Sequence, residues 1–138
     1  MIDATEKNTK AVGNVSEAYC TARFLELGWR VYLPFGDNER CDLLIERSPN
    51  VFEKVQVKTA RLKNGYIESK VCSSYRHRGR KVKDYRGEVD WIALYCADIR
   101  KVFLVKPESA PSFSIQLRLE SPANNQTKNI RWAKDYEI

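Results

Sequence analysis

The sequence of 138 residues contains a single histidine, His77, and its four cysteines stand at least 21 residues apart. It therefore lacks the paired Cys and His spacing of a structural zinc site, and we expect no zinc. Cys20, Cys72 and Cys96 lie in apolar stretches, where free cysteines are commonly buried. Since the only imidazole lies in an arginine-rich segment, these cysteines are predicted to be unreactive free thiols.

No apolar run approaches the roughly 20 residues that a membrane span requires, and residues 1–8 lack the apolar core of a signal peptide. We therefore expect a cytoplasmic protein with no membrane partner. Hydrophobic residues make up 43% of the chain and charged residues 30%, which is a globular composition. The length predicts one domain over 1–138, with residues 1–10 as a flexible N-terminal segment.

Hydrophobic periodicity predicts one early α-helix followed by a series of strands. Apolar residues recur at three- and four-residue spacing over 14–27, and Gly28 follows as a helix cap. The near-continuous apolar run 89–96 predicts a central strand. Further strands are expected at 29–34, 41–46, 51–59, 66–72, 102–105 and 115–119, and a short helix at 129–136. This order indicates an α/β domain with a mixed sheet.

Positive charge is concentrated in one segment of the chain. Residues 61–86 hold nine Lys or Arg against two acids, whereas the net charge of the whole chain is only +6. The segment also holds hydroxyl and aromatic side chains, a mixture typical of contacts to phosphate and sugar oxygens. We therefore predict a basic loop between two strands that contacts DNA through Lys70, Ser73, Ser74, Tyr75, Arg76, His77, Arg78, Arg80, Lys81, Lys83 and Arg86.

A second cluster brings together residues of two successive predicted strands. Asp42 opens one apolar strand, and Gln56 and Lys58 lie in the next. Because side chains alternate along a strand, Gln56 and Lys58 point to one face, while Val55 and Val57 point to the other. If the two strands form a hairpin, Asp42 lies beside Gln56 and Lys58. A lysine interrupting an apolar strand is poor packing, so the cluster is better explained as a functional site.

The residue types of this cluster suit phosphodiester hydrolysis. The Asp42 carboxylate, the Gln56 side-chain oxygen and the Val57 carbonyl are hard oxygen ligands of the kind that Mg²⁺ prefers. Lys58 can orient or deprotonate the attacking water, or stabilise negative charge that develops on phosphorus. Glu17, near the start of the predicted helix, would add a second carboxylate at the same end of the sheet. Taken alone, Glu17 is equally consistent with an acid placed to favour the helix dipole.

These residues stand in motifs that resemble the PD-(D/E)XK nuclease superfamily, in which a helix carrying Glu precedes an Asp and a (D/E)-x-K tripeptide on successive strands. The resemblance is closest to a small branch associated with group I introns, whose members include a homing endonuclease. That branch is known to use Gln in place of the usual acid. The matching motifs are Gly13-x-x-Ser16-Glu17, Cys41-Asp42-Leu43, Val55-Gln56-Val57-Lys58-Thr59-Ala60 and Tyr85-x-Gly87-x-Val89-Asp90.

The resemblance implies a single restriction-endonuclease-like domain of the α/β class, with a central mixed β-sheet flanked by helices. It implies cleavage of double-stranded DNA by a homo-oligomer, a dimer or a tetramer, with Mg²⁺ as cofactor and Mn²⁺ as its substitute. It assigns catalytic roles to Asp42, Gln56, Lys58 and Glu17. Together with the oxygen chemistry described above, it predicts that the metal ligands are Asp42, Glu17, Gln56 and Val57.

Two alternatives remain open at this point. A Holliday-junction resolvase or a restriction-like nuclease shares the same core, and would differ from a homing endonuclease in its preferred DNA substrate. A DNA-binding module that has lost catalysis is the second alternative, because Gln56 stands where an acid is usual.

Overall fold

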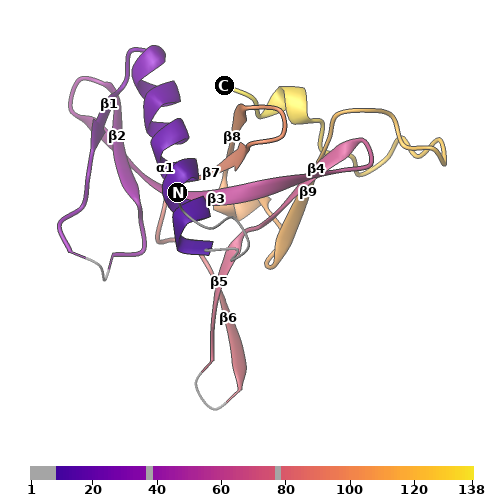
Figure 1. Cartoon of the computed structure of the whole chain (residues 1–138), viewed down its shortest axis with the longest axis horizontal. Coiled ribbons are helices and arrows are strands. Elements are labelled where there is room, and N and C mark those ends of the chain that lie inside the picture. The colour runs from indigo at the N-terminus through magenta and orange to yellow at the C-terminus, as the bar shows by residue number, and fades with distance from the viewer. Residues whose placement is uncertain (1–8, 37–38, 77–78) are drawn as a thin grey trace, which may run out of the picture.

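The structure is a computed structural model, and it describes residues 9–36, 39–76 and 79–138 (Figure 1). Helix α1 (Thr9–Glu26) begins earlier than the periodicity predicts, so Thr9 and Lys10 are helical. The rest of the predicted flexible segment, 1–8, lies outside the described residues. Within the described residues, no helix is both long and apolar enough to span a membrane.

Helix α1 packs on the sheet through a narrow stripe of residues. Ser16, Cys20 and Phe24 recur every four residues, and all three are buried. The helix ends where the sequence predicts: Gly28 has a positive φ of 82°, its N–H donates to Leu25 O, and the N–H of Trp29 donates to Phe24 O. This pair of hydrogen bonds is the Schellman arrangement, for which glycine is the favoured residue.

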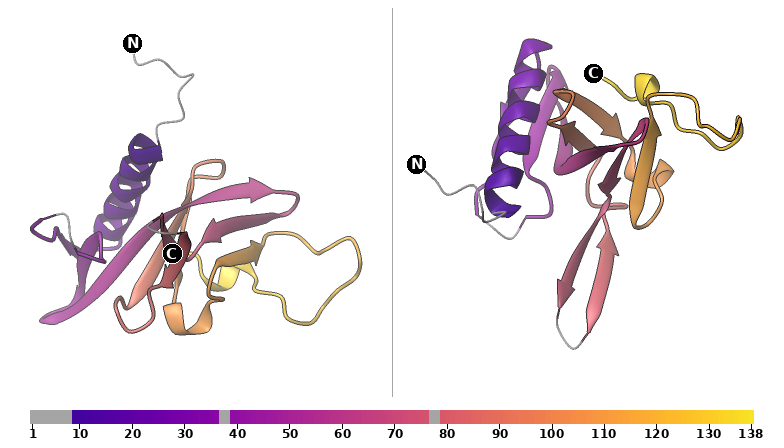
Figure 2. Two further views of the ribbon diagram at one scale, coloured as in Figure 1. Left: turned by 90° about the horizontal axis from the view of Figure 1, so that it is seen from below. Right: turned by 45° about the vertical axis from the view of Figure 1, so that its right-hand side comes forward.

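The main sheet has seven strands, and β3 is the strand on which it is built (Figures 1 and 2). Strand β3 pairs antiparallel with β2 over its first half and with β4 at its far end, and it pairs in parallel with β7. The sheet is therefore mixed, as expected. The strands are β1 (Arg30–Tyr32), β2 (Leu43–Ser48), β3 (Val51–Lys63), β4 (Tyr66–Lys70), β7 (Trp91–Cys96), β8 (Lys101–Val105) and β9 (Ser114–Arg118).

Apolar side chains form a core on each face of the sheet. On the α1 face, Phe24 packs with Val55 and Val57 of β3 and with residues of β2 and β7. On the opposite face, Ile92 and Leu94 pack with residues of β4, β8 and β9. Strand β7 is buried along nearly its whole length, which confirms the central strand predicted from its continuous apolar run. Strand β8 is its antiparallel hairpin partner, as expected.

The basic segment differs from the prediction. Instead of a loop it forms a second sheet of two antiparallel strands, β5 (Cys72–Arg76) and β6 (Arg80–Asp84), which projects from the body of the molecule as a hairpin (Figure 1). The predicted strand 66–72 is also divided at Val71, which lies between β4 and β5 and whose N–H donates to Phe113 O, one step beyond the last β4–β9 pair. Residues 81–83 of β6 are all exposed, so this strand carries little apolar alternation and its sequence resembles that of a loop.

The predicted C-terminal helix over 129–136 is also wrong. This segment contains only a short 3₁₀ helix, Ala133–Asp135, and Trp132 instead forms a parallel bridge with Arg118 of β9. A second 3₁₀ helix, Pro107–Ser109, follows β8. In the described residues, α1 is thus the only α-helix, so the sheet is flanked by one α-helix rather than several.

Candidate active site

The end of the β2–β3 ladder places Asp42 beside β3. The Asp42 N–H donates to Val55 O at 2.9 Å, which continues the strand pairing one step beyond Leu43. Its side-chain Oδ2 then accepts hydrogen bonds from Gln56 Nε2 at 2.7 Å and from the backbone N–H of Val57 at 2.9 Å. The carboxylate oxygen therefore accepts the Val57 N–H, which has no backbone partner on β2 at this point because β2 begins only at Leu43. The predicted proximity of Asp42 and Gln56 is confirmed.

The alternation predicted along β3 is confirmed as well. Val55 and Val57 are buried in the core beneath α1, whereas Gln56 and Lys58 are half-buried. The two polar side chains thus leave the α1 core undisturbed, and the strand exposes them where β2 has ended.

Burial raises the pKa of the Asp42 carboxyl above its usual range. The hydrogen bond from the Val57 N–H and the positive charge of Lys58 both lower this pKa, but burial outweighs them. Lys58 is therefore close enough to Asp42 to interact with its charge. Burial disfavours the charged form of this carboxyl, so a cation bound in the site would stabilise it.

Glu17 comes to the same region from α1. Burial raises the pKa of its carboxyl, and the negative charge of Asp42 raises it further. The helix is fixed to β3 next to this point, since Ser16 Oγ and Thr59 Oγ1 form a 2.6 Å hydrogen bond. Ser16 precedes Glu17 and Thr59 follows Lys58, so this contact sets the position of the acid relative to the lysine.

The side chain of Lys58 is held by an aromatic ring. Its Nζ lies 5.1 Å from the ring centroid of Tyr85, which is buried. An ammonium over a ring face is attracted by the ring quadrupole, so this contact keeps the amine near the cluster without a carboxylate partner on the lysine itself.

The donor set fits a hard divalent cation. Glu17 and Asp42 supply two carboxylates, and the negative charge of Asp42 raises the pKa of Glu17. Gln56 Nε2 lies 2.7 Å from Asp42 Oδ2 and 3.4 Å from the Val57 carbonyl oxygen, so these oxygen donors lie next to one another. In the described part of the chain, no group of three His, Cys, Asp or Glu side chains converges. A cation here would therefore need amide and carbonyl oxygens, which suits Mg²⁺ and not a zinc-type site.

The buried cysteines are not expected to take part in this chemistry. Cys20, Cys72 and Cys96 are buried free thiols, as predicted. Burial raises the pKa of the Cys20 thiol to about 12, and the charges of Glu17 and Asp42 add to the effect. A thiol with so high a pKa stays protonated and is a poor nucleophile.

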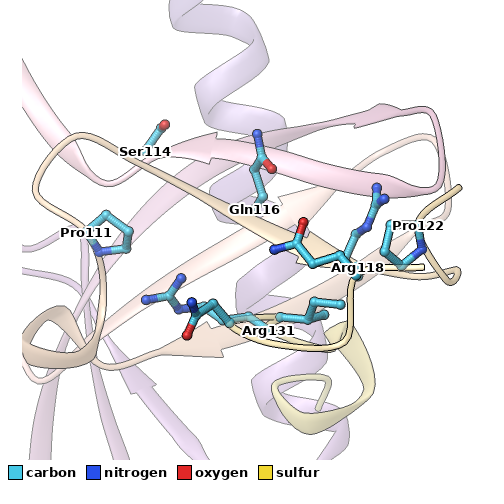
Figure 3. A pocket seen from close by; sticks show the side chains of 9 residues that line it. Pro111, Ser114, Gln116, Arg118, Pro122 and Arg131 are labelled. Atoms are coloured by element: carbon cyan, nitrogen blue, oxygen red, sulfur yellow. The ribbon is translucent and has the colours of Figure 1, made fainter. Parts of the chain in front are cut away.

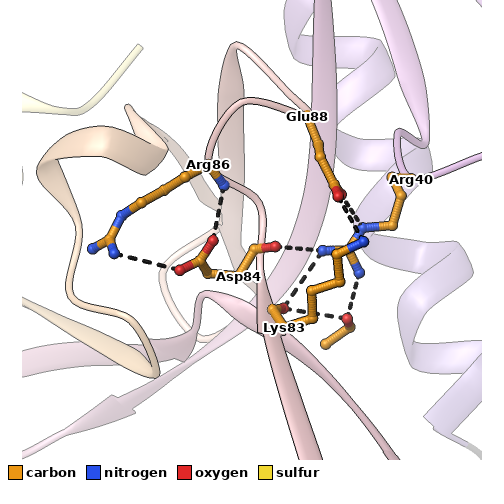
Figure 4. A network of polar contacts seen from close by, with 6 residues as sticks. Arg40, Lys83, Asp84, Arg86 and Glu88 are labelled. Atoms are coloured by element: carbon orange, nitrogen blue, oxygen red, sulfur yellow. Dashed lines mark hydrogen bonds and ion pairs between the residues drawn. The ribbon is translucent and has the colours of Figure 1, made fainter.

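Arg40 is a residue of this site that the sequence did not single out. Its guanidinium donates to Glu88, to Ser73 Oγ and to the backbone carbonyl of Asp84, and it lies 4.1 Å from the Tyr85 ring centroid (Figure 4). The same ring contacts Lys58. Arg40 therefore fastens the base of the β5–β6 hairpin beside the active-site cluster. No local pattern marks it, because its partners lie more than 30 residues away along the chain.

The residues predicted to contact DNA lie in several different structural environments. Ser73 and Lys83 lie at the hairpin base, where Lys83 pairs with Glu88 at 2.8 Å. Arg86 is exposed, pairs with Asp84 at 3.4 Å and donates to Ala110 O. Lys81 is exposed on β6, and Lys70 lies on β4 over the ring of Phe113. The side chains of Ser74, Tyr75, Arg76, His77, Arg78 and Arg80 lie outside the described part of the structure.

The fold and the arrangement of Asp42, Gln56 and Lys58 define a chain of the restriction-endonuclease-like class. A family model described as PD-(D/E)XK endonuclease matches residues 7–138, and the chain belongs to this family. It is therefore a nuclease. A bacterial homing endonuclease, I-Ssp6803I, has a similar structure, with a TM-score of 0.76, 22% sequence identity, and coverage of 94% of this chain and 88% of that chain. Comparison with curated protein sequences gave no significant match.

Proposed function

We propose that this chain is a divalent-metal-dependent endonuclease that hydrolyses phosphodiester bonds in duplex DNA, and that it acts as a homing endonuclease. The observation that carries the proposal is the contact of Asp42 Oδ2 with both Gln56 Nε2 and the Val57 N–H, with Lys58 close enough to interact with the same carboxylate. Membership of the PD-(D/E)XK family supports the nuclease chemistry, and the fold shared with I-Ssp6803I supports the homing assignment.

Asp42, Glu17 and the oxygens of Gln56 and Val57 would hold the cation, which we assign as Mg²⁺ with Mn²⁺ as a substitute. When bound, the cation supplies Lewis-acid stabilisation of charge on the phosphate and lowers the pKa of a bound water. Gln56 would have to turn its amide, since its nitrogen now faces Asp42. The Asp42 carboxylate would then exchange an amide contact for an ionic one.

Lys58 would act on the water and on the developing phosphorane charge. Its ammonium can hold the attacking water by a hydrogen bond and attract the negative oxygens of the phosphate. The water oxygen would then form the new bond to phosphorus and lose a proton to solvent, while the bond from phosphorus to one sugar oxygen breaks and that oxygen takes up a proton. Tyr85 keeps the lysine at this place without neutralising it.

The β5–β6 hairpin would contact the DNA next to the cleaved bond. It projects away from the sheet, as Figure 1 shows, and its exposed residues include Lys81. A two-stranded ribbon is narrow enough to enter a major groove. The Arg40 contacts at the hairpin base would fix its direction relative to Lys58.

We further propose that the chain acts as a homo-oligomer. One site hydrolyses one strand at a time, so a cut through both strands is most simply made by two sites related by a two-fold axis. Exposed apolar side chains are available for subunit contact: Leu33 is 76% exposed and Phe35 is fully exposed, and Leu33 borders a shallow groove with Leu25 of α1. Sedimentation of the purified chain, alone and with duplex DNA, tests this part.

The test of the function is incubation of the chain with linear duplex, supercoiled plasmid and a four-way junction, each with Mg²⁺, Mn²⁺ or EDTA. Cleavage of duplex only when metal is present supports the proposal. Preference for the junction would favour a resolvase of the same fold, which remains the second candidate because the core residues are shared. Binding without cleavage under all metal conditions would favour an inactive DNA-binding module, the alternative that Gln56 raises.

A further inference from the structure

A groove of about 320 Å³ lies on the edge of the sheet away from β1, between β9 and the segment 122–131 (Figure 3). Gln116 and Arg118 enter it from β9, and Arg131 enters it from the neighbouring segment. The two arginines are held together by the backbone, because the Arg118 N–H donates to Arg131 O at 2.8 Å. Both guanidinium groups therefore belong to one surface.

The groove presents positive charge and hydrogen-bond donors without a carboxylate. Its lining includes two guanidinium groups, the amides of Gln116, Gln126 and Asn129, and the hydroxyl of Ser114, but no Asp or Glu. Elsewhere in the described residues, Arg23, Arg30, Arg40, Arg47 and Arg86 each form an ion pair with a carboxylate.

Arg118 and Arg131 are held differently from those paired arginines. Arg118 lies over the ring of Tyr66, 5.2 Å from its centroid, and donates to Asn64 O at 3.4 Å. Arg131 donates to Ser109 O at 3.4 Å. These neutral contacts orient the guanidinium groups without cancelling their charge, which remains available to an external anion.

Strand pairing extends this surface from β9 across β4 to the far end of β3. In the β3–β4–β9 ladder, Arg61 stands opposite Glu68 and Glu68 opposite Gln116, while Lys70 stands opposite Ser114. Their side chains therefore share one face of the sheet. The alternate residues Ile67, Ser69, Ile115 and Leu117 are buried on the other face, so the charged face is turned to solvent.

A second groove of about 430 Å³ continues this surface to Lys58. Its lining contains the cations Lys58, Arg61, Lys63 and Lys70, and its one acid, Glu68, is paired with Lys63 at 2.7 Å. Cationic side chains thus follow one another from Lys58 across β3, β4 and β9, strands that are spaced about 5 Å apart.

We propose that this face, from Lys58 to the groove of Arg118 and Arg131, is a second DNA-contacting surface that binds the phosphate backbone to one side of the cleaved bond. We call it the β9 surface. The proposal rests on the proposed nuclease function and assigns DNA contacts outside the β5–β6 hairpin. A row of cations leading away from Lys58 matches the regular negative charge of a DNA strand.

The test compares the parent with Arg118→Gln/Arg131→Gln in binding to a 30-base-pair duplex of arbitrary sequence, in EDTA and over a range of salt. If both arginines contact phosphate, the double variant binds more weakly and its plot of log K against log salt is shallower by about 2 per subunit, at about 0.9 per contact. The matched control, Arg30→Gln/Lys101→Gln, removes two exposed cations that are paired with Glu46 and Glu137 elsewhere. It should keep the parental slope.

Equal slopes for the parent and the double variant overturn the β9 surface while leaving the nuclease function intact, since the parent still binds and cuts. Failure of the parent to bind any duplex overturns the DNA-binding proposal itself. An equal loss in the control variant would mean that only total charge matters, and it also overturns the β9 surface. If the double variant fails to fold, Arg131→Gln alone should reduce the slope by about 1.

Discussion

Gln56 Nε2 donates a 2.7 Å hydrogen bond to Asp42 Oδ2, and the same oxygen accepts the backbone N–H of Val57 at 2.9 Å. One carboxylate oxygen thus accepts both hydrogen bonds. Gln56 is neutral where related nucleases place an acid, so it can approach Asp42 without repulsion. A second carboxylate at this distance would raise the pKa of the pair still further.

The first prediction concerns the pH dependence of the metal-free protein. The pKa values of Asp42 and Glu17 are raised in the folded chain, so the folded state binds their protons more tightly than the unfolded state does. The free energy of unfolding should therefore fall as pH rises from the ordinary carboxyl range through the raised values, and then stay level as far as these groups are concerned. Carbon-13 NMR titration of the carboxyl groups should show both midpoints above their usual range.

Asp42→Asn separates the effect of the buried charge from that of the hydrogen bonds. The Asn oxygen can accept both hydrogen bonds now made to Oδ2, while the buried charge is gone. We expect the variant to melt at or above the parental Tm at neutral pH, and the pKa of Glu17 to move down because Asp42 no longer raises it. A clear fall in Tm, or an unmoved Glu17, would contradict the coupling of the two carboxyls.

Lys58→Arg tests whether the ammonium has a specific task. The guanidinium keeps the positive charge but is planar, bulkier and not readily deprotonated. We expect cleavage to fall by at least about 100-fold, the usual loss on removing a positioned proton-transfer group, with DNA affinity nearly unchanged. Single-turnover cleavage and binding in EDTA give the two values. Comparable cleavage by the variant would mean that only the positive charge of Lys58 is needed.

Arg40→Gln tests the attachment of the hairpin to the catalytic cluster. The substitution removes the charged donors to Glu88, Ser73 and the Asp84 carbonyl, so we expect the unfolding free energy to fall by about 1–3 kcal/mol. The hairpin base should open more often, which faster amide hydrogen exchange at Ser73 and Asp84 would show. Arg47→Gln is the comparison, because that arginine pairs with Glu53 on β3 and touches no part of the hairpin. Its effect on exchange should be confined to β2, β3 and the neighbourhood of Trp29 and Trp91, whose rings Arg47 contacts.

Replacement of Arg76, Arg78 and Arg80 by alanine tests DNA binding by the hairpin. If all three contact phosphate, the salt dependence of binding becomes shallower by about 2 to 3 per subunit, and binding weakens on every sequence. If one of them reads a guanine edge, its loss costs about 1–3 kcal/mol at the preferred site and relaxes the choice of one base pair. Unchanged binding over the whole salt range would show that the hairpin lies away from the DNA.

Local patterns in the sequence were sufficient for the central fold and for the proximity of Asp42 and Gln56. The predicted helix end at Gly28, the β2–β3 hairpin and the buried β7 strand all depend on periodicity and turn chemistry, which neighbouring residues carry. The site follows from these elements, because strand alternation alone decides the face on which Gln56 and Lys58 lie.

The errors have a common cause in contacts between distant segments. Residues 81–83 of β6 are all exposed and show no apolar period, and the segment near Trp132 is ordered by its bridge to β9 rather than by helix propensity. Arg40 was missed for the same reason: its partners come from β5, β6 and the turn at Glu88. Sequence patterns do not record such pairings.

The most direct test of the central claim is a cleavage assay of the parent and Asp42→Asn on a mixture of supercoiled plasmid and long chromosomal DNA, with Mg²⁺, Mn²⁺ or EDTA. We expect that the parent cuts both strands with either metal, that EDTA stops the reaction, and that the folded Asp42→Asn variant is inactive. Cleavage that persists in EDTA, or equal cleavage by Asp42→Asn, would contradict metal-dependent hydrolysis at this site.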